Sequence, residues 1–305
     1  MTEKTIFTNI NYRNGANTYF PFDIVSDCFA NGASLFFATE ASEKMIGLEE
    51  HFIPFCKSNN LSYTFSKSDD YNGNQVLVVS KGAFEILNVS IPEATQGFDD
   101  GNYSVSESTI MKPQMIAISK NGTNHIIARI PSYSDSLGSL RSGYNAAAMS
   151  AQLLSDAIES LEKDKNPTIL YVDVNGGRTR GSTNAPYNRN DYILPDYNPK
   201  TNRFLKSNHE LANINHNLNT FSDLMAKQGF KLYSPSVSWV DSFGNGFCND
   251  CVFYKNIETI PHVEYSWEHV RSSNGYYNYK GGVSYLSDLP LPDHALLILG
   301  YSEAA

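Results

Sequence analysis

Two segments in the second half of the chain carry side chains that can do chemistry. Asp173 and Asn175 come at the end of one strongly apolar segment, and Asp293 and His294 open another. The packing of a buried strand requires neither an Asp-x-Asn nor an Asp-His pair. Metal-assisted cleavage of a phosphate ester does use such groups, because it needs a positioned water and a cation that offsets charge on the phosphoryl oxygens. The two segments therefore predict a phosphate-cleaving site.

Other expected strands also end in polar residues. Asn9 and Asn11 end the first strand, Glu40 ends the second, Arg129 stands near the end of a middle strand, and Asp250 lies within a late strand. Each residue alone has a simpler explanation, because Asp and Asn favour turns and a carboxylate favours the start of a helix. Their recurrence at strand ends indicates a shared site.

In this order the motifs resemble those of the endonuclease/exonuclease/phosphatase superfamily, whose members have the deoxyribonuclease I-like fold. The resemblance spans about residues 5 to 301. Ile6–Asn11 resembles the family's first strand with its Asn, Phe37–Glu40 the strand with the metal-binding Glu, and Asn74–Lys81 a mid-chain strand. Val172–Asn175 resembles the Gly-Asp-x-Asn motif, Asn249–Phe253 the Arg-x-Asp-aromatic motif, and Pro292–His294 the Ser-Asp-His motif.

The resemblance implies a Mg²⁺ or Mn²⁺ site. Glu40 and Asp293 would supply carboxylate oxygens, which are hard ligands suited to Mg²⁺. Asn9 would complete the set of groups around the metal.

The resemblance also implies catalytic roles. Asp173 would orient or deprotonate the attacking water, and Asn175 would hold the phosphate. His294 would bond a phosphate oxygen in the transition state, with Asp250 fixing its ring, because such a pair selects the tautomer and supports the imidazolium. Arg129 stands where relatives often have Tyr or His, and its guanidinium suits a phosphate but not proton transfer at neutral pH. The implied protein is a metal-dependent phosphoesterase.

A long polar segment, 176–219, follows the Asp-x-Asn motif, and segments of this kind are usually functional or mobile. Arg178 and Arg180 open it and, with Asn11, are candidate substrate-binding residues. The Arg and Tyr residues of this segment favour DNA or RNA as substrate, through phosphate contacts and base stacking. A phosphoinositide or nucleotide phosphatase of the same fold is the alternative.

The sequence departs from the family pattern at four places. Cys248 and Asn249 stand where the family has an Arg before the late Asp. Val172 stands near the usual Gly, Pro292 replaces the usual Ser, and Arg129 replaces an aromatic or imidazole side chain. A catalytically degenerate protein that binds a partner through the Arg/Tyr segment therefore stays open as a hypothesis of another class.

Short apolar segments with helices between some of them would carry these residues. Helical spacing predicts helices over 19–31, 42–57, 140–163 and 221–228, the second with Ser42 as its N-cap. Strands are expected at 5–11, 33–39, 61–65, 75–80, 84–89, 109–119, 125–130, 168–174, 247–254, 259–263 and 295–301, with a hairpin turn at Asn121-Gly122. This pattern favours an α/β or α+β protein, a two-sheet β-sandwich flanked by helices, with residues 1–305 as a single domain.

Composition narrows the function further. The 305 residues carry a formal net charge of −9, which disfavours non-specific coating of nucleic acid but not a nuclease whose metal supplies positive charge. Cys248 and Cys251 resemble half of a zinc site, and reduced thiols are the simpler interpretation. We recognise neither a signal peptide nor a membrane span. The expectation is a monomer that is cytoplasmic, or exported without a recognisable signal.

Overall fold

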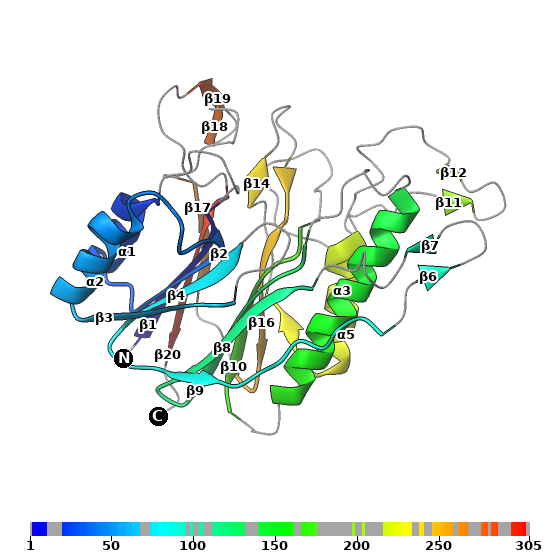
Figure 1. Cartoon of the computed structure of the whole chain (residues 1–305), viewed down its shortest axis with the longest axis horizontal. Coiled ribbons are helices and arrows are strands. Elements are labelled where there is room, and N and C mark those ends of the chain that lie inside the picture. The colour runs from blue at the N-terminus through cyan, green and yellow to red at the C-terminus, as the bar shows by residue number, and fades with distance from the viewer. Residues whose placement is uncertain are drawn as a thin grey trace.

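Figure 1 shows the protein as a computed structural model, in which two β-sheets lie between helices. The structure describes residues 2–10, 20–67, 74–95, 98–99, 104–105, 112–131, 140–161, 166–175, 197–198, 203–204, 216–233, 238–240, 246–258, 262–267, 276–279, 282–285 and 294–302.

The first sheet has six strands within the described residues, and it joins the two ends of the chain. In spatial order they are β17 (His262–Ser266), β20 (Leu296–Ser302), β1 (Thr2–Asn9), β2 (Leu35–Ala41), β4 (Gln75–Lys81) and β3 (Leu61–Phe65). β1 and β2 run parallel, and the other neighbours are antiparallel. The carboxyl ends of β1 and β2 therefore meet at one edge of this sheet.

The second sheet is also six-stranded. In spatial order it contains β13 (Lys231–Leu232), β16 (Asp250–Lys255), β10 (Thr168–Asp173), β9 (Thr123–Arg129), β8 (Gln114–Lys120) and β5 (Glu85–Leu87). β9 and β10 run parallel, and β16 pairs with β10 in the opposite direction. The start of β16 therefore lies beside the ends of β9 and β10.

The alternation of apolar residues along each strand explains how the sheets pack. In β10, Ile169 and Tyr171 belong to the core between the sheets, whereas Leu170 and Val172 face a second core beneath helices. Helices α3 (Leu140–Leu161) and α5 (His216–Lys227) cover that outer face, and α1 (Phe22–Ala30) and α2 (Ile53–Ser58) cover the outer face of the first sheet (Figure 1). The predicted fold class, a helix-flanked two-sheet sandwich, is confirmed.

Most expected elements form with shifted ends, and two predictions are wrong in detail. The turn at Asn121 and Gly122 is confirmed: both have positive φ, 50° and 76°, as a tight hairpin between β8 and β9 requires. The helix expected over 42–57 begins only at Leu48, where a π-helical turn, η1 (Leu48–Phe52), leads into α2. Residues 42–45 instead form a turn in which the carbonyl oxygen of Ser42 accepts the N–H of Met45. The Ser42 hydroxyl accepts the N–H of Lys44 within this turn and therefore caps no helix.

The strand expected over 247–254 is interrupted. β15 (Gly246–Phe247) ends before Cys248, and β16 starts at Asp250. At the break, Asn249 offers its carbonyl oxygen to the N–H of Val174 at 2.7 Å, and its own N–H turns toward Ser238. The interruption brings the start of β16 against the end of β10.

The remaining described strands form short pairs. They are β6 (Phe98–Asp99) with β7 (Ser104–Val105), β11 (Tyr197–Asn198) with β12 (Arg203–Phe204), β14 (Trp239–Val240) with β15, and β18 (Tyr276–Tyr279) with β19 (Gly282–Tyr285). Two of these strands and the start of α5 fall within the segment 176–219, most of which lies outside the described residues. No helix in the described ranges has the length and apolar character of a membrane span.

Candidate active site

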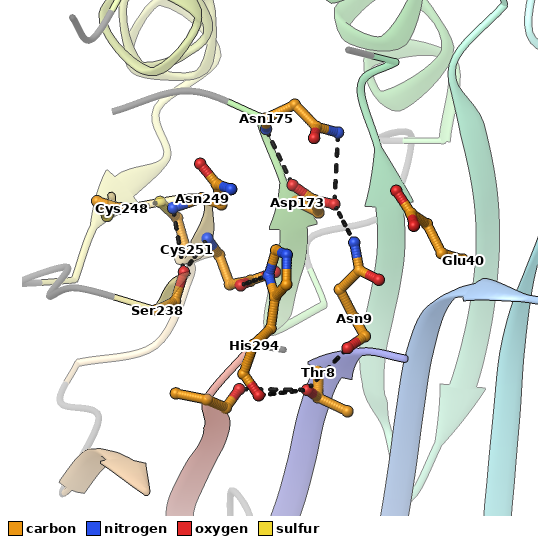
Figure 2. Close-up of polar contacts among 12 residues, drawn as sticks. Thr8, Asn9, Glu40, Asp173, Asn175, Ser238, Cys248, Asn249, Cys251 and His294 are labelled. Carbon is orange, nitrogen blue, oxygen red and sulfur yellow. Dashed lines mark hydrogen bonds and ion pairs between the residues drawn. The ribbon is translucent and has the colours of Figure 1, made fainter. Parts of the chain in front are cut away.

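Polar side chains from both sheets converge at one edge of the sandwich (Figure 2). Asp173, the last residue of β10, is level with Arg129 of β9 on one side and with Asp250 of β16 on the other. Asn9 ends β1 in the facing sheet and reaches across to Asp173. These residues meet because the parallel pairs β1–β2 and β9–β10 both end at this edge.

Asp173 is the centre of the arrangement and is fully buried. Its Oδ2 accepts a hydrogen bond from Asn9 Nδ2 at 2.8 Å, and its Oδ1 accepts the backbone N–H of Asn175 at 2.9 Å. Burial, and then the negative charge of Asp250, raise the pKa of Asp173 to about 7, although the charges of His294 and Arg129 oppose the rise. A carboxyl group in this state can accept a proton near neutral pH.

Asn175 supports Asp173 from the strand end. Its φ of 48° is left-handed, a conformation that Asn adopts more readily than other non-glycine residues. In that position its Nδ2 donates to the carbonyl oxygen of Ile130 at 2.7 Å and approaches Asp173 Oδ2 at 3.4 Å. Asn175 therefore ties the end of β10 to the residue that follows β9.

Asp250 and His294 form a buried pair. His294 Nδ1 lies 2.6 Å from Asp250 Oδ2, and the two side chains are almost inaccessible to solvent. The hydrogen bond fixes the orientation of the imidazole ring. The two side chains are thus in contact, and the orienting role of Asp250 stays a prediction.

Ser238 is a supporting residue that the sequence analysis missed. Its Oγ accepts the backbone N–H groups of Asn249 and Asp250, at 3.0 and 2.9 Å, and its carbonyl oxygen accepts the N–H of Ala295 at 2.7 Å. Ser238 thus holds the backbone of Asp250 and that of Ala295, the residue after His294. No local pattern marks Ser238, because its role depends on partners that come from distant parts of the chain.

Glu40 and Arg129 form a third contact within the site. Arg129 Nη2 lies 2.5 Å from Glu40 Oε1, and Arg129 Nε lies 3.7 Å from Asp173 Oδ2. The guanidinium thus bridges a carboxylate from each sheet. Glu40 has a φ of 47° and stands where the pairing of β2 with β4 shifts register, between Ala38 and Ala41.

The described residues include side-chain oxygens that could act as ligands of a divalent cation. The Glu40 carboxylate and the Asn9 amide lie at neighbouring strand ends, since Asn9 is level with Thr39. Hard oxygen ligands of this kind match Mg²⁺ and Mn²⁺. Within the described part of the chain, no cluster of three or more His, Cys, Asp or Glu residues could hold a metal. The role of Glu40 as a metal ligand stays a prediction.

Four predicted site residues cannot be placed. Asn11, Arg178, Arg180 and Asp293 lie outside the described residues. The structure thus brings together Asn9, Glu40, Arg129, Asp173, Asn175, Asp250 and His294, which come from widely separated parts of the chain.

Cys248 and Cys251 lie close to each other beside this site. Their sulfurs are 3.6 Å apart, both side chains are fully buried, and they are free thiols. Burial is the main reason that the pKa of Cys251 is raised well above its usual range. The described residues include no further partner that would complete a zinc site.

No protein-family model and no curated protein matches this chain in sequence. Solved structures do match it over nearly its whole length. An AP endonuclease from Archaeoglobus fulgidus has a TM-score of 0.56 at 14% identity, over 97% of this chain and 98% of that one. A 3'-5' exonuclease (NExo) from Neisseria meningitidis has a TM-score of 0.54 at 12% identity, over 97% and 98% of the two chains.

A third similar structure is an endonuclease/exonuclease/phosphatase family protein from Bacteroides thetaiotaomicron. Its TM-score is 0.51 at 11% identity, over 98% of this chain and 97% of that one. The protein therefore has the fold of these solved structures, the deoxyribonuclease I-like fold. This agrees with the resemblance found in the sequence motifs.

Proposed function

We propose that this protein is a metal-dependent phosphoesterase that hydrolyses phosphodiester bonds of nucleic acid. The observation that carries the proposal is the state of Asp173, which is buried between Asn9, Arg129 and Asp250 and has a pKa of about 7. A general base is most effective when its pKa is close to the working pH. The structural similarity to an AP endonuclease and an exonuclease supports the choice of nucleic acid.

In this proposal Asp173 takes a proton from the attacking water. Asn9 and Asn175 hold its two oxygens, at 2.8 and 2.9 Å, so that the carboxylate keeps one orientation toward the substrate. Such positioning removes much of the entropic part of the barrier.

His294 stabilises the charge that develops on the phosphoryl group. Its Nδ1 faces Asp250, so the opposite ring nitrogen, Nε2, is the one that would donate to a phosphate oxygen. Asp250 keeps the ring of His294 oriented through this hydrogen bond. This arrangement supplies a hydrogen bond that strengthens in the transition state.

Glu40, Asp293 and Asn9 would hold the Mg²⁺ or Mn²⁺ ion that the resemblance implies. When bound, such an ion offsets negative charge on the phosphoryl oxygens. Arg178, Arg180 and Asn11 would contact the substrate outside the reacting phosphate.

Nicking of supercoiled plasmid by the full chain tests this proposal, with Mg²⁺, Mn²⁺ or EDTA in parallel. We expect metal-dependent nicking that falls at least about 10²-fold in Asp173→Ala and in His294→Ala, the usual effect of removing a general acid or base. Asp156→Ala is the matched control, because Asp156 is an exposed carboxylate on α3 that bonds to Gln152 of the same helix.

Unchanged nicking in both site variants, or nicking that persists in EDTA, would overturn the proposal. If the folded wild-type protein does not nick DNA or cleave RNA, phosphoinositides and nucleotides are the next substrates to assay. Binding of a partner that depends on Arg178 and Arg180, without hydrolysis, would identify a degenerate binding protein instead.

A further inference from the structure

Arg129 occupies an unusual place for a cationic side chain. Its guanidinium lies between Glu40, 2.5 Å from Nη2, and Asp173, 3.7 Å from Nε. The Arg129 side chain is only 8% exposed, and that of Glu40 is 15% exposed. Because water screens a buried ion pair poorly, the attraction between these groups is stronger than at the surface.

The backbone of β2 presents Glu40 to Arg129. Glu40 stands in the irregular stretch between Ala38 and Ala41 and has a left-handed φ of 47°, which a non-glycine residue adopts at a cost. Irregular strand positions of this kind commonly re-aim a side chain. The re-aimed carboxylate ends against the guanidinium, so one of its oxygens is already bonded to a positive charge.

We propose that Arg129 competes with the divalent cation for the carboxylate of Glu40, so that tight metal binding requires this ion pair to open. This inference rests on the proposed role of Glu40 as metal ligand. The guanidinium already occupies Oε1 of Glu40, and it would repel a divalent cation that binds the same carboxylate, so the closed ion pair weakens metal binding. Arg129 is therefore a positioning residue that sets the affinity for metal through Glu40.

The size of the effect follows from the population of the open state. Apparent affinity falls by the fraction of molecules whose binding site is competent. An ion pair that is closed in about nine molecules of ten would therefore weaken metal binding about tenfold. Removal of the guanidinium should therefore increase the affinity for metal by about tenfold or more, because it also removes the repulsion between the two cations.

Titration with Mn²⁺, followed by the electron paramagnetic resonance signal of the free ion, tests the inference on the full chain. We expect Arg129→Met to bind Mn²⁺ at least about tenfold more tightly than the wild type. Arg129→Lys keeps a positive charge, and its affinity for Mn²⁺ should stay within about threefold of that of the wild type. A higher affinity in Arg129→Met than in Arg129→Lys would indicate that the charge of residue 129, rather than its shape, sets the affinity.

Glu40→Gln supplies the second control. The double variant Glu40→Gln/Arg129→Met should lose the gain, because the carboxylate for which the two cations compete is gone. Equal affinities in the wild type and Arg129→Met, or a gain that persists in the double variant, would overturn the inference.

Arg129→Met removes a buried charge and could lower the thermal stability of the protein. The increase in Tm on addition of Mn²⁺ therefore gives a second readout, since a ligand stabilises the folded state according to its affinity. We expect a larger increase for Arg129→Met than for the wild type, and an equal or smaller increase would contradict the inference. Neither readout requires hydrolysis, so a protein that binds Mn²⁺ in this way but cleaves no phosphodiester would overturn only the proposed function.

Discussion

At the scale of single residues, the site depends on groups whose ordinary chemistry has been changed by burial. Asp173 would be an unremarkable strand-end carboxylate if it were exposed. Its position beside Asp250 and away from water moves its pKa to about 7. The same burial means that Asp173 opposes folding once it is ionised, as expected where a functional site is built at the expense of stability.

The pH dependence of stability should reveal this directly. In the unfolded chain Asp173 ionises near its ordinary pKa of 3.8, whereas in the folded protein it stays protonated until about pH 7. Its contribution to stability is therefore fully present below about pH 4 and is lost as the pH rises toward 7. In Asp173→Asn this loss should disappear.

Urea unfolding at several pH values between 4 and 7 measures the effect. We expect the difference in the free energy of unfolding between wild type and Asp173→Asn to change by at least about 1 kcal/mol across this range, because one unit of pKa difference corresponds to about 1.4 kcal/mol. Parallel curves for the two proteins would show that the folded-state pKa of Asp173 is not raised.

At the scale of elements, the candidate site combines the ends of regular strands with a few irregular backbone positions. Regular strands place side chains on alternating faces, and this explains the three apolar cores. Two residues of the candidate site, Glu40 and Asn175, instead stand where the backbone leaves the strand conformation, both with positive φ. The interruption of the strand expected over 247–254 belongs to the same group, because it allows Ser238 to bond Asn249 and Asp250.

Two substitutions at Asn175 separate backbone from side chain. Both Asn175→Gly and Asn175→Ala remove the hydrogen bond to the carbonyl oxygen of Ile130, but only Gly adopts a φ of 48° without strain. We expect Asn175→Ala to be less stable than Asn175→Gly by about 1 kcal/mol, measured by thermal unfolding, since the left-handed conformation costs about 1–2 kcal/mol for ordinary residues. Equal stability would mean that the strand end relaxes.

At the scale of the whole molecule, the two sheets are tied together at both ends. The site ties one end through the bond between Asn9 and Asp173, residues 164 positions apart in the chain. Toward the other end of β1, the ammonium group of Lys120 from the second sheet lies 3.4 Å from Glu3 and donates to Ser80 at 3.1 Å and to the carbonyl oxygen of Lys81 at 3.0 Å. The pair between Lys120 and Glu3 is almost completely buried.

Lys120→Met should therefore destabilise the fold without changing the chemistry. Removal of one partner leaves the Glu3 carboxylate in a buried position without its cation, which typically costs about 3–5 kcal/mol. Urea unfolding should show this loss, while the kcat of folded protein stays within about twofold of the wild type. A variant as stable as the wild type would show that Lys120 does not stabilise the contact between the sheets.

Much of the fold could be predicted from the sequence because it depends on local patterns. Alternating apolar residues mark the strands, and Asn121-Gly122 marks a hairpin because both residues tolerate positive φ. The helix expected from Ser42 was wrong for a related reason: a serine followed by apolar residues at helical spacing is common to a turn and a helix start. The structure decides for the turn, because the helical residues begin only at Leu48.

The sequence by itself determined which residue types stand at the strand ends, and hence the class of chemistry expected of them. Only the tertiary structure decided how these residues pair: Arg129 with Glu40 and Asp173, Asp250 with His294, and Ser238 with the start of β16. The physical reason is that charge interactions and burial depend on distances between strands that are far apart in the chain. A carboxylate in the sequence has an ordinary pKa, and the folded protein alone places Asp173 away from water and beside a second negative charge.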